Sequence, residues 1–172
     1  VGVKAGSSVE APRPYAIEKP VVFYGSSITQ GGCASKPGNS YEAFLGRWLN
    51  CDHINLGFAG SGKGEVNIAE YIASLPMSAF VLDYDHNAPT PEYLEQTHEK
   101  MYRRFRAARP DVPIVMATMP KVTATEHSVR RRATILATYE KARAEGDDKV
   151  YFIDGKEMMA IFDDDGKWFL DK

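Results

Sequence analysis

Five short runs of apolar residues are spaced along the chain, and turn residues follow each of them. The runs lie at 21–24, 53–56, 79–82, 113–117 and 150–153. They are continuous rather than alternating and are rich in β-branched and aromatic residues, which is typical of strands that are buried on both faces. The pattern therefore predicts five strands of a parallel sheet.

The segments between these runs repeat their apolar residues at helical spacing. Helices are predicted from about residue 40, over 65–75, over 91–109 and over 126–144, and a short helical stretch is expected near 157–161. The apolar stripes are clearest in the first and third of these helices: Tyr41, Phe44, Leu45, Trp48 and Leu49, and then Leu94, His98, Met101, Tyr102 and Phe105. Strands that alternate with helices, joined by right-handed crossovers, predict a three-layer α/β/α domain.

The first 19 residues differ in composition from the rest of the chain. They are rich in Gly, Ser and Pro, and Pro12, Pro14 and Pro20 favour an extended backbone. We interpret residues 1–19 as a linker or the tail of a preceding module, so an additional N-terminal domain is expected in the parent protein. Residues 20–172 are expected to form one domain, since 44% apolar residues are enough for a single core.

Charge and composition exclude several classes of protein. Lys and Arg number 21 against 23 Asp and Glu, and the densest basic run, 130–132, lies inside a helical pattern, which favours a solvated helix face over a nucleic-acid site. No apolar run approaches the ~20 residues that span a bilayer, and the N-terminus shows no signal peptide. We therefore expect neither a nucleic-acid nor a membrane partner, and the localisation stays open. Cys33 and Cys51 are too few for a disulfide framework.

Small polar residues and glycines follow three of the predicted strands. Ser27 comes just after the first strand, Gly60 lies in the glycine-rich segment 57–64 after the second, and Asn87 follows the third. Ligands of parallel α/β sheets bind outside the carboxyl ends of the strands, so the three loops can converge. A serine held there can act as a nucleophile, and a glycine N–H and an asparagine amide can donate to an oxyanion. Each loop taken singly is also explained as an ordinary turn.

Together the blocks VVFYGSSIT, INLGFAGSG and FVLDYDHNAP resemble those of the SGNH (GDSL-like) hydrolases over about residues 20–155. The resemblance implies a flavodoxin-like α/β/α sandwich, Ser27 as nucleophile, and an oxyanion hole built from the N–H groups of Ser27 and Gly60 and the side chain of Asn87. It also implies no cofactor and small acyl esters, in particular acetyl esters of carbohydrates, as substrates. Ser26 and Asp85 replace the family's usual aspartate and glycine and indicate a GSSIT sub-branch; with His86 they are expected near the pocket.

The histidine that activates the serine in this family lies in an Asp-x-x-His turn after the last strand, and no such turn follows Ile153. The four histidines are all upstream: His53, His86, His98 and His127. Segment 83–86 has the Asp-x-x-His spacing, but it lies in the third block and not after the last strand. His86 is therefore a weak candidate for the base. His98 is expected in the core and His127 on the surface. We therefore expect the base to be supplied from outside this chain, and the chain alone to be impaired.

Other functions remain open from the sequence. An acyltransferase or a thioesterase could use the same residues, and a non-catalytic binding module could keep the fold without the base. Segment 57–64 is within one residue of a phosphate-binding loop, although position 64 is Gly where the Mg²⁺-binding hydroxyl should be. A metal site at Asp83, Asp85 and His86 is a further alternative.

Overall fold

The computed structural model describes residues 2–120 and 124–158 of the chain. At its centre lies a parallel five-stranded sheet in the order β2-β1-β3-β4-β5, which confirms the predicted α/β architecture with the strand order of flavodoxin-like domains. The strands are β1 (Ile17–Gly25), β2 (Cys51–Gly57), β3 (Ala79–Asp83), β4 (Ile114–Ala117) and β5 (Val150–Ile153). The first strand begins at Ile17, earlier than the apolar run alone predicts.

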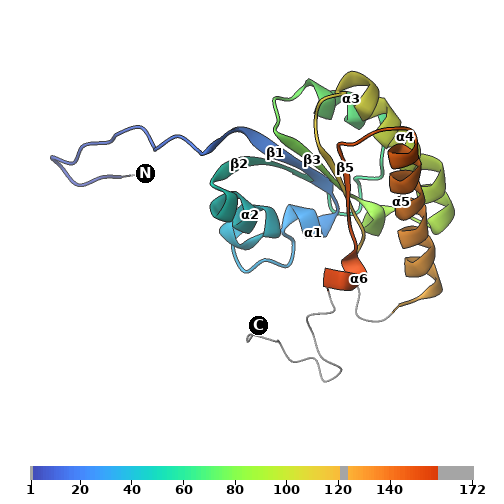
Figure 1. The fold of residues 1–172 in the computed structure, drawn as a ribbon. Coiled ribbons are helices and arrows are strands. Elements are labelled where there is room, and N and C mark those ends of the chain that lie inside the picture. Colours follow the sequence, from blue (N-terminus) through green and yellow to red (C-terminus); the bar gives the residue numbers. More distant parts are fainter. Residues whose placement is uncertain (1, 121–123, 159–172) are drawn as a thin grey trace.

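Helices cover the two faces of the sheet unequally (Figure 1). One face carries α3 (Val66–Ser74), α4 (Pro91–Ala108) and α5 (Glu126–Ala144), whereas α1 (Ser27–Gln30) and α2 (Tyr41–Leu49) lie on the other. Short turns complete the order: η1 (Pro37–Asn39), η2 (Asp85–Asn87) and α6 (Gly155–Met158). Of the stretch expected near 157–161, residues 159–161 lie outside the described residues. None of the helices described is long and apolar enough to cross a bilayer.

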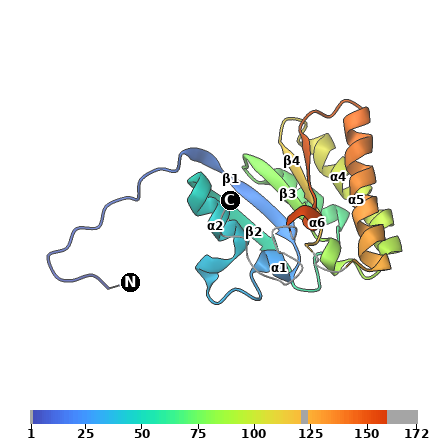
Figure 2. The ribbon, with the colours of Figure 1, turned by 60° about the horizontal axis from the view of Figure 1, so that its bottom comes forward.

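The main core lies between the sheet and α3–α5; Figure 2 shows α4 and α5 together on this side of the sheet. The side chains of β1, β3 and β4 that face these helices are fully buried, and Phe80 of β3 packs on Phe105 of α4 with ring centroids 4.5 Å apart. The predicted stripe of α4 is confirmed, since all five of its residues are buried: Leu94, His98, Met101, Tyr102 and Phe105. Residues 2–16 form neither strand nor helix and are exposed.

On the other face, α2 packs differently from its predicted stripe. Its fully buried side is formed by Glu42, Ala43 and Gly46, whereas Trp48 is 75% exposed. The reason is close approach, because a Cβ at Gly46 would lie 3.0 Å from the Cys51 carbonyl oxygen. Beside α2 the sheet face borders an apolar groove of about 570 Å³.

The strand register aligns the last residues of the three strands that precede the expected site loops. Gly25 of β1 is paired with Gly57 of β2 on one side and with Asp83 of β3 on the other. The loops that begin after these three residues therefore leave the sheet side by side at its carboxyl edge.

Candidate active site

Ser27 is the first residue of α1, directly after β1. Ser26 caps this helix by accepting a hydrogen bond from the Ile28 N–H (3.2 Å), and Gly31 ends it with a left-handed φ of 85°. Ser26 is buried, whereas Ser27 is half-buried. Among the described residues, the Ser27 hydroxyl has no hydrogen-bond partner, so its lone pairs are not committed within this part of the fold.

A half-buried carboxylate anchors the helix that carries Ser27. Asp83, the last residue of β3, accepts hydrogen bonds from the hydroxyls of Thr29 (3.2 Å) and Tyr41 (3.0 Å). Burial raises the pKa of Asp83 to about 7; the nearby charge of Asp85 adds to the shift, and the two hydroxyls oppose it. The sequence indicated neither hydroxyl, because Thr29 and Tyr41 meet Asp83 only through the fold.

A second set of hydrogen bonds holds the backbone of α1 in place. Asn55, on β2, donates its side-chain N–H to the Thr29 carbonyl oxygen (2.8 Å) and to the buried carboxylate of Glu42. Its Oδ1 accepts the Gly57 N–H (2.8 Å). The turn bearing Ser27 is thus tied to β2, β3 and α2, which favours a fixed position for the serine.

Gly60 and Asn87 are in direct contact. The Gly60 N–H donates to Asn87 Oδ1 (3.1 Å), and Asn87 Nδ2 donates to the carbonyl oxygens of Phe58 (2.7 Å) and Gly62 (3.0 Å). Gly60 has φ of 67°, and a Cβ there would meet nothing within 4 Å, so glycine is needed for backbone conformation rather than for space. The structure therefore brings the two predicted oxyanion residues together, with their polar groups bonded inside the loop.

Asp83 and His86, which have the Asp-x-x-His spacing, do not form an acid–base pair. Asp83 is bonded to Thr29 and Tyr41, whereas His86 is exposed and its Nδ1 lies against Met119 Sδ. The metal alternative loses support for the same reason, because Asp83 and Asp85 have different partners. Across residues 2–120 and 124–158 there is no cluster of three or more His, Cys, Asp or Glu suited to a metal ion.

The other three histidines lie in the core, at the surface and at the border of the apolar groove. His98 is completely buried, stacks on Tyr84 and contacts Thr138 through Nδ1 (3.0 Å); burial lowers its pKa to about 4. His127 is exposed near the start of α5, as expected, and His53 borders the apolar groove. Within the described residues, no histidine is hydrogen-bonded to the Ser27 hydroxyl.

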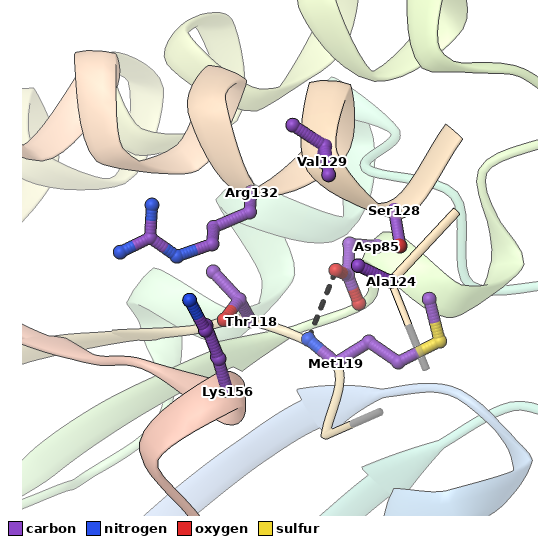
Figure 3. Close-up of a pocket in the computed structure, with 8 residues that line it drawn as sticks. All are labelled: Asp85, Thr118, Met119, Ala124, Ser128, Val129, Arg132 and Lys156. Atoms are coloured by element: carbon purple, nitrogen blue, oxygen red, sulfur yellow. Dashed lines mark hydrogen bonds between the residues drawn. The ribbon is translucent and has the colours of Figure 1, made fainter. Parts of the chain in front are cut away.

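Asp85 is buried next to a small pocket of mixed polar and apolar lining (Figure 3). Its Oδ2 accepts the Met119 N–H (3.0 Å), and burial raises its pKa. Arg131 donates to the carbonyl oxygens of Asp85 and Ala88, which fixes η2 against α5. The interpretation of 130–132 as a solvated face was wrong for Arg131, which is 8% exposed; the apolar stripe of α5 is too weak to reveal which arginine points inward.

Segment 57–64 is not arranged to hold a phosphate. At the start of α3, Glu65 Oε2 accepts the Lys63 N–H (3.0 Å) and the Tyr24 hydroxyl (2.8 Å). A carboxylate in this position would repel a bound phosphate. Gly64 instead makes room for Tyr84, whose hydroxyl would lie 2.4 Å from a Cβ at that position.

Comparisons with known proteins agree with this architecture. The sequence profile described as the GDSL-like Lipase/Acylhydrolase family matches residues 18–168. A solved protein described as a GDSL-like lipase, from Bacteroides ovatus, is 32% identical with a TM-score of 0.73, over 84% of this chain and 44% of its own. The salicylyl-acyltransferase SsfX3 of a tetracycline biosynthetic pathway is 21% identical with a TM-score of 0.74, over 96% and 52%.

A family two carbohydrate esterase from Clostridium thermocellum, solved with cellohexaose, is 20% identical with a TM-score of 0.62, over 85% of this chain and 56% of its own. The chain thus spans about half the length of these three solved proteins. No curated protein matches the sequence.

Proposed function

The chain belongs to the GDSL-like lipase/acylhydrolase family, and from that premise we propose that it supplies the nucleophile and the oxyanion donors of an ester hydrolase. Ser27 is the proposed nucleophile. The substrates are proposed to be esters of small acyl groups, acetyl esters of carbohydrates in particular. The observation that carries the proposal is the convergence of three loops at one sheet edge, with an uncommitted serine hydroxyl on the first and the bonded Gly60–Asn87 pair on the other two.

In the proposed reaction the Ser27 oxygen attacks the ester carbonyl as its proton passes to a base. The tetrahedral intermediate then expels the alcohol, which takes up that proton, and water hydrolyses the acyl-enzyme. The N–H groups of Ser27 and Gly60 and the amide of Asn87 would hold the oxyanion. Since Gly60 now donates to Asn87 and Asn87 to two carbonyls, these donors must exchange partners when the intermediate forms.

The base is proposed to be a histidine outside these 172 residues. Support comes from the placement of the four histidines, none of which is bonded to the Ser27 hydroxyl. Loss of the base of a serine triad lowers kcat by about 10⁶ in subtilisin. We therefore expect this chain to be nearly inactive on p-nitrophenyl acetate, and a version continued further along its gene to be active. Equal turnover by the two forms would contradict the proposal.

The test of the nucleophile is covalent labelling combined with ester hydrolysis in the longer version. A fluorophosphonate probe should modify Ser27, and Ser27→Ala should abolish labelling and reduce kcat for p-nitrophenyl acetate by at least about 10³. Ser61→Ala, a change in the neighbouring exposed loop, should behave like the wild type. Labelling that survives in Ser27→Ala would exclude Ser27, and no labelling of either form would favour a non-catalytic binding module.

Acyl transfer to an alcohol is the second candidate, because one of the similar folds is an acyltransferase. Both reactions share the acyl-enzyme and differ only in what attacks it. The two reactions are distinguished by analysing the products formed when a sugar is added as the acyl acceptor. Free acetate as the main product supports the hydrolase, and acetylated alcohol supports the transferase.

A further inference from the structure

Four consecutive backbone N–H groups in the loop of Gly60 are each bonded to a different group. The pairs are Gly57 N–H with Asn55 Oδ1 (2.8 Å), Phe58 N–H with the Gly25 carbonyl oxygen (3.0 Å), Ala59 N–H with Gln30 Oε1 (3.0 Å) and Gly60 N–H with Asn87 Oδ1 (3.1 Å). The first three acceptors belong to β2, β1 and α1, whereas the fourth belongs to a residue of the proposed oxyanion hole. Of these four donors, only the Gly60 N–H would change its partner in the proposed reaction.

The same reaction would withdraw Asn87 from this loop. Its side chain accepts the Gly60 N–H and donates to the carbonyl oxygens of Phe58 and Gly62. When the Asn87 amide turns to the oxyanion, it cannot keep all three of these bonds. The strength of a hydrogen bond falls steeply with poor distance and angle, so an oxyanion donor acts only while its loop holds it in place. The loop therefore needs anchors that do not take part in the exchange.

Gln30 supplies the anchor that is nearest to Gly60 along the loop. It is the last residue of α1, three residues after Ser27, and it accepts the N–H of the residue directly before Gly60. Its backbone also contacts the start of the loop, because a Cβ at Gly57 would lie 2.1 Å from the Gln30 nitrogen. The Gln30 amide is uncharged, so it adds no negative charge beside a developing oxyanion. Gln30 thus connects the turn of the nucleophile with the loop of the second donor.

We propose that Gln30 is a positioning residue for the oxyanion hole, which holds the Gly60 N–H in place while Asn87 exchanges partners. It acts through the Ala59 N–H and not on the substrate. The inference rests on the proposed function and adds to it a residue for which the motifs gave no role. Loss of the Gln30 side chain should lower turnover and leave substrate binding unchanged, because the oxyanion develops only on the way to the tetrahedral intermediate.

The experiment compares Gln30→Met with the wild type in the longer version of the protein. Methionine is similar in length but only a weak acceptor, so the bond from the Ala59 N–H is lost. The kcat for p-nitrophenyl acetate should fall by roughly three- to tenfold, the change that corresponds to one neutral hydrogen bond, while KM stays the same. Gln96→Met is the matched control, because Gln96 is exposed on α4 and its side chain forms no hydrogen bond among the described residues. It should leave both constants unchanged.

A second measurement reports on the contact itself. In ¹⁵N-labelled protein, the amide hydrogen of Ala59 should exchange faster in Gln30→Met than in the wild type, because it is no longer hydrogen-bonded. Gln30→Glu keeps an acceptor oxygen and should retain the wild-type exchange rate at Ala59. Equal acceleration in the two variants would show that the acceptor oxygen is not what holds the loop, and would overturn the inference.

The kinetic outcomes separate this inference from the proposed function. An unchanged kcat in Gln30→Met overturns the inference when Ser27→Ala inactivates the same enzyme. A higher KM with an unchanged kcat overturns it too, since it would make Gln30 a substrate-binding residue. Full activity of Ser27→Ala would contradict the proposed function instead.

Discussion

At the scale of single residues, the site depends on groups that are far apart in the sequence. Ser27, Gly60 and Asn87 could be named from local motifs, because each lies just after an apolar run. Tyr41 and Asn55 could not, since their hydrogen bonds to Asp83 and Thr29 exist only when α2, β2 and β3 are packed together. Motifs therefore predict candidate reacting groups better than the groups that hold them.

The pKa of Asp83 predicts how stability depends on pH. Its native value of about 7 lies above the ordinary 3.8, so the folded state binds the proton more tightly than the unfolded state. The resulting stabilisation is complete below about pH 4 and is lost as the pH rises through 7, by up to roughly 4 kcal/mol at about 1.4 kcal/mol per unit. Chemical denaturation of the wild type and of Asp83→Asn, from pH 4 to 8, measures it.

The two free energies of unfolding should converge at low pH, and the wild type should fall below the variant as the pH rises. Asp85 and Glu42 are buried nearby and are present in both proteins, so only the difference between the curves reports on Asp83. Asp148→Asn, at an exposed position, serves as the control and should follow the wild type. Parallel curves for wild type and Asp83→Asn would show that Asp83 titrates normally.

At the scale of elements, the helices and strands follow the pattern of the sequence closely, and their packing follows it less well. The helix of 126–144 is predicted with the bounds that it has, yet Arg131 points inward on it. The apolar stripe of α2 is real but only partly buried, because the small residues Ala43 and Gly46 let another side of the helix approach the sheet. Periodicity gives the element, whereas side-chain volume decides which side is covered.

The contact between α5 and η2 gives a prediction at this scale. Arg131→Met removes two charged hydrogen bonds to the Asp85 and Ala88 carbonyls and should destabilise the fold by about 3 kcal/mol or more, at 1.5–3 kcal/mol for each bond. Arg130→Met, on the same helix, removes exposed ion pairs with Glu92 and Glu95, its only side-chain partners among the described residues, and should cost less than about 1 kcal/mol. Urea denaturation compares them, and equal losses would contradict the structural role of Arg131.

At the scale of the whole molecule, the two faces of the sheet are packed to different degrees. The face under α3–α5 is closed, whereas the other face borders the apolar groove beside α2. The continuous apolar strands predicted burial on both faces, and they gave the sheet and its layers correctly. The apolar pattern could not predict how completely helices cover each face of the sheet, because a strand buried under a helix and a strand beside a groove have the same pattern.

This difference predicts where the fold is sensitive to truncation. Phe105→Ala, in the closed core, should cost about 3–5 kcal/mol in the free energy of unfolding. Trp48→Ala removes a larger ring, but one that is 75% exposed, and should change stability by less than about 0.5 kcal/mol. Melting curves and urea titrations of both variants check the prediction, and a comparable loss for Trp48 would mean that its ring is covered in solution.

The hydrogen bond from Gly60 to Asn87 has a consequence for what the site can recognise. At rest the amide oxygen of Asn87 occupies the donor that the reaction would use. An ester carbonyl is a weaker acceptor than an amide oxygen and gains little by displacing it, whereas an alkoxide is a much stronger one. Under the proposed function, this donor would therefore favour the tetrahedral species over the ground-state ester, because only a strongly negative oxygen would displace the Asn87 amide oxygen.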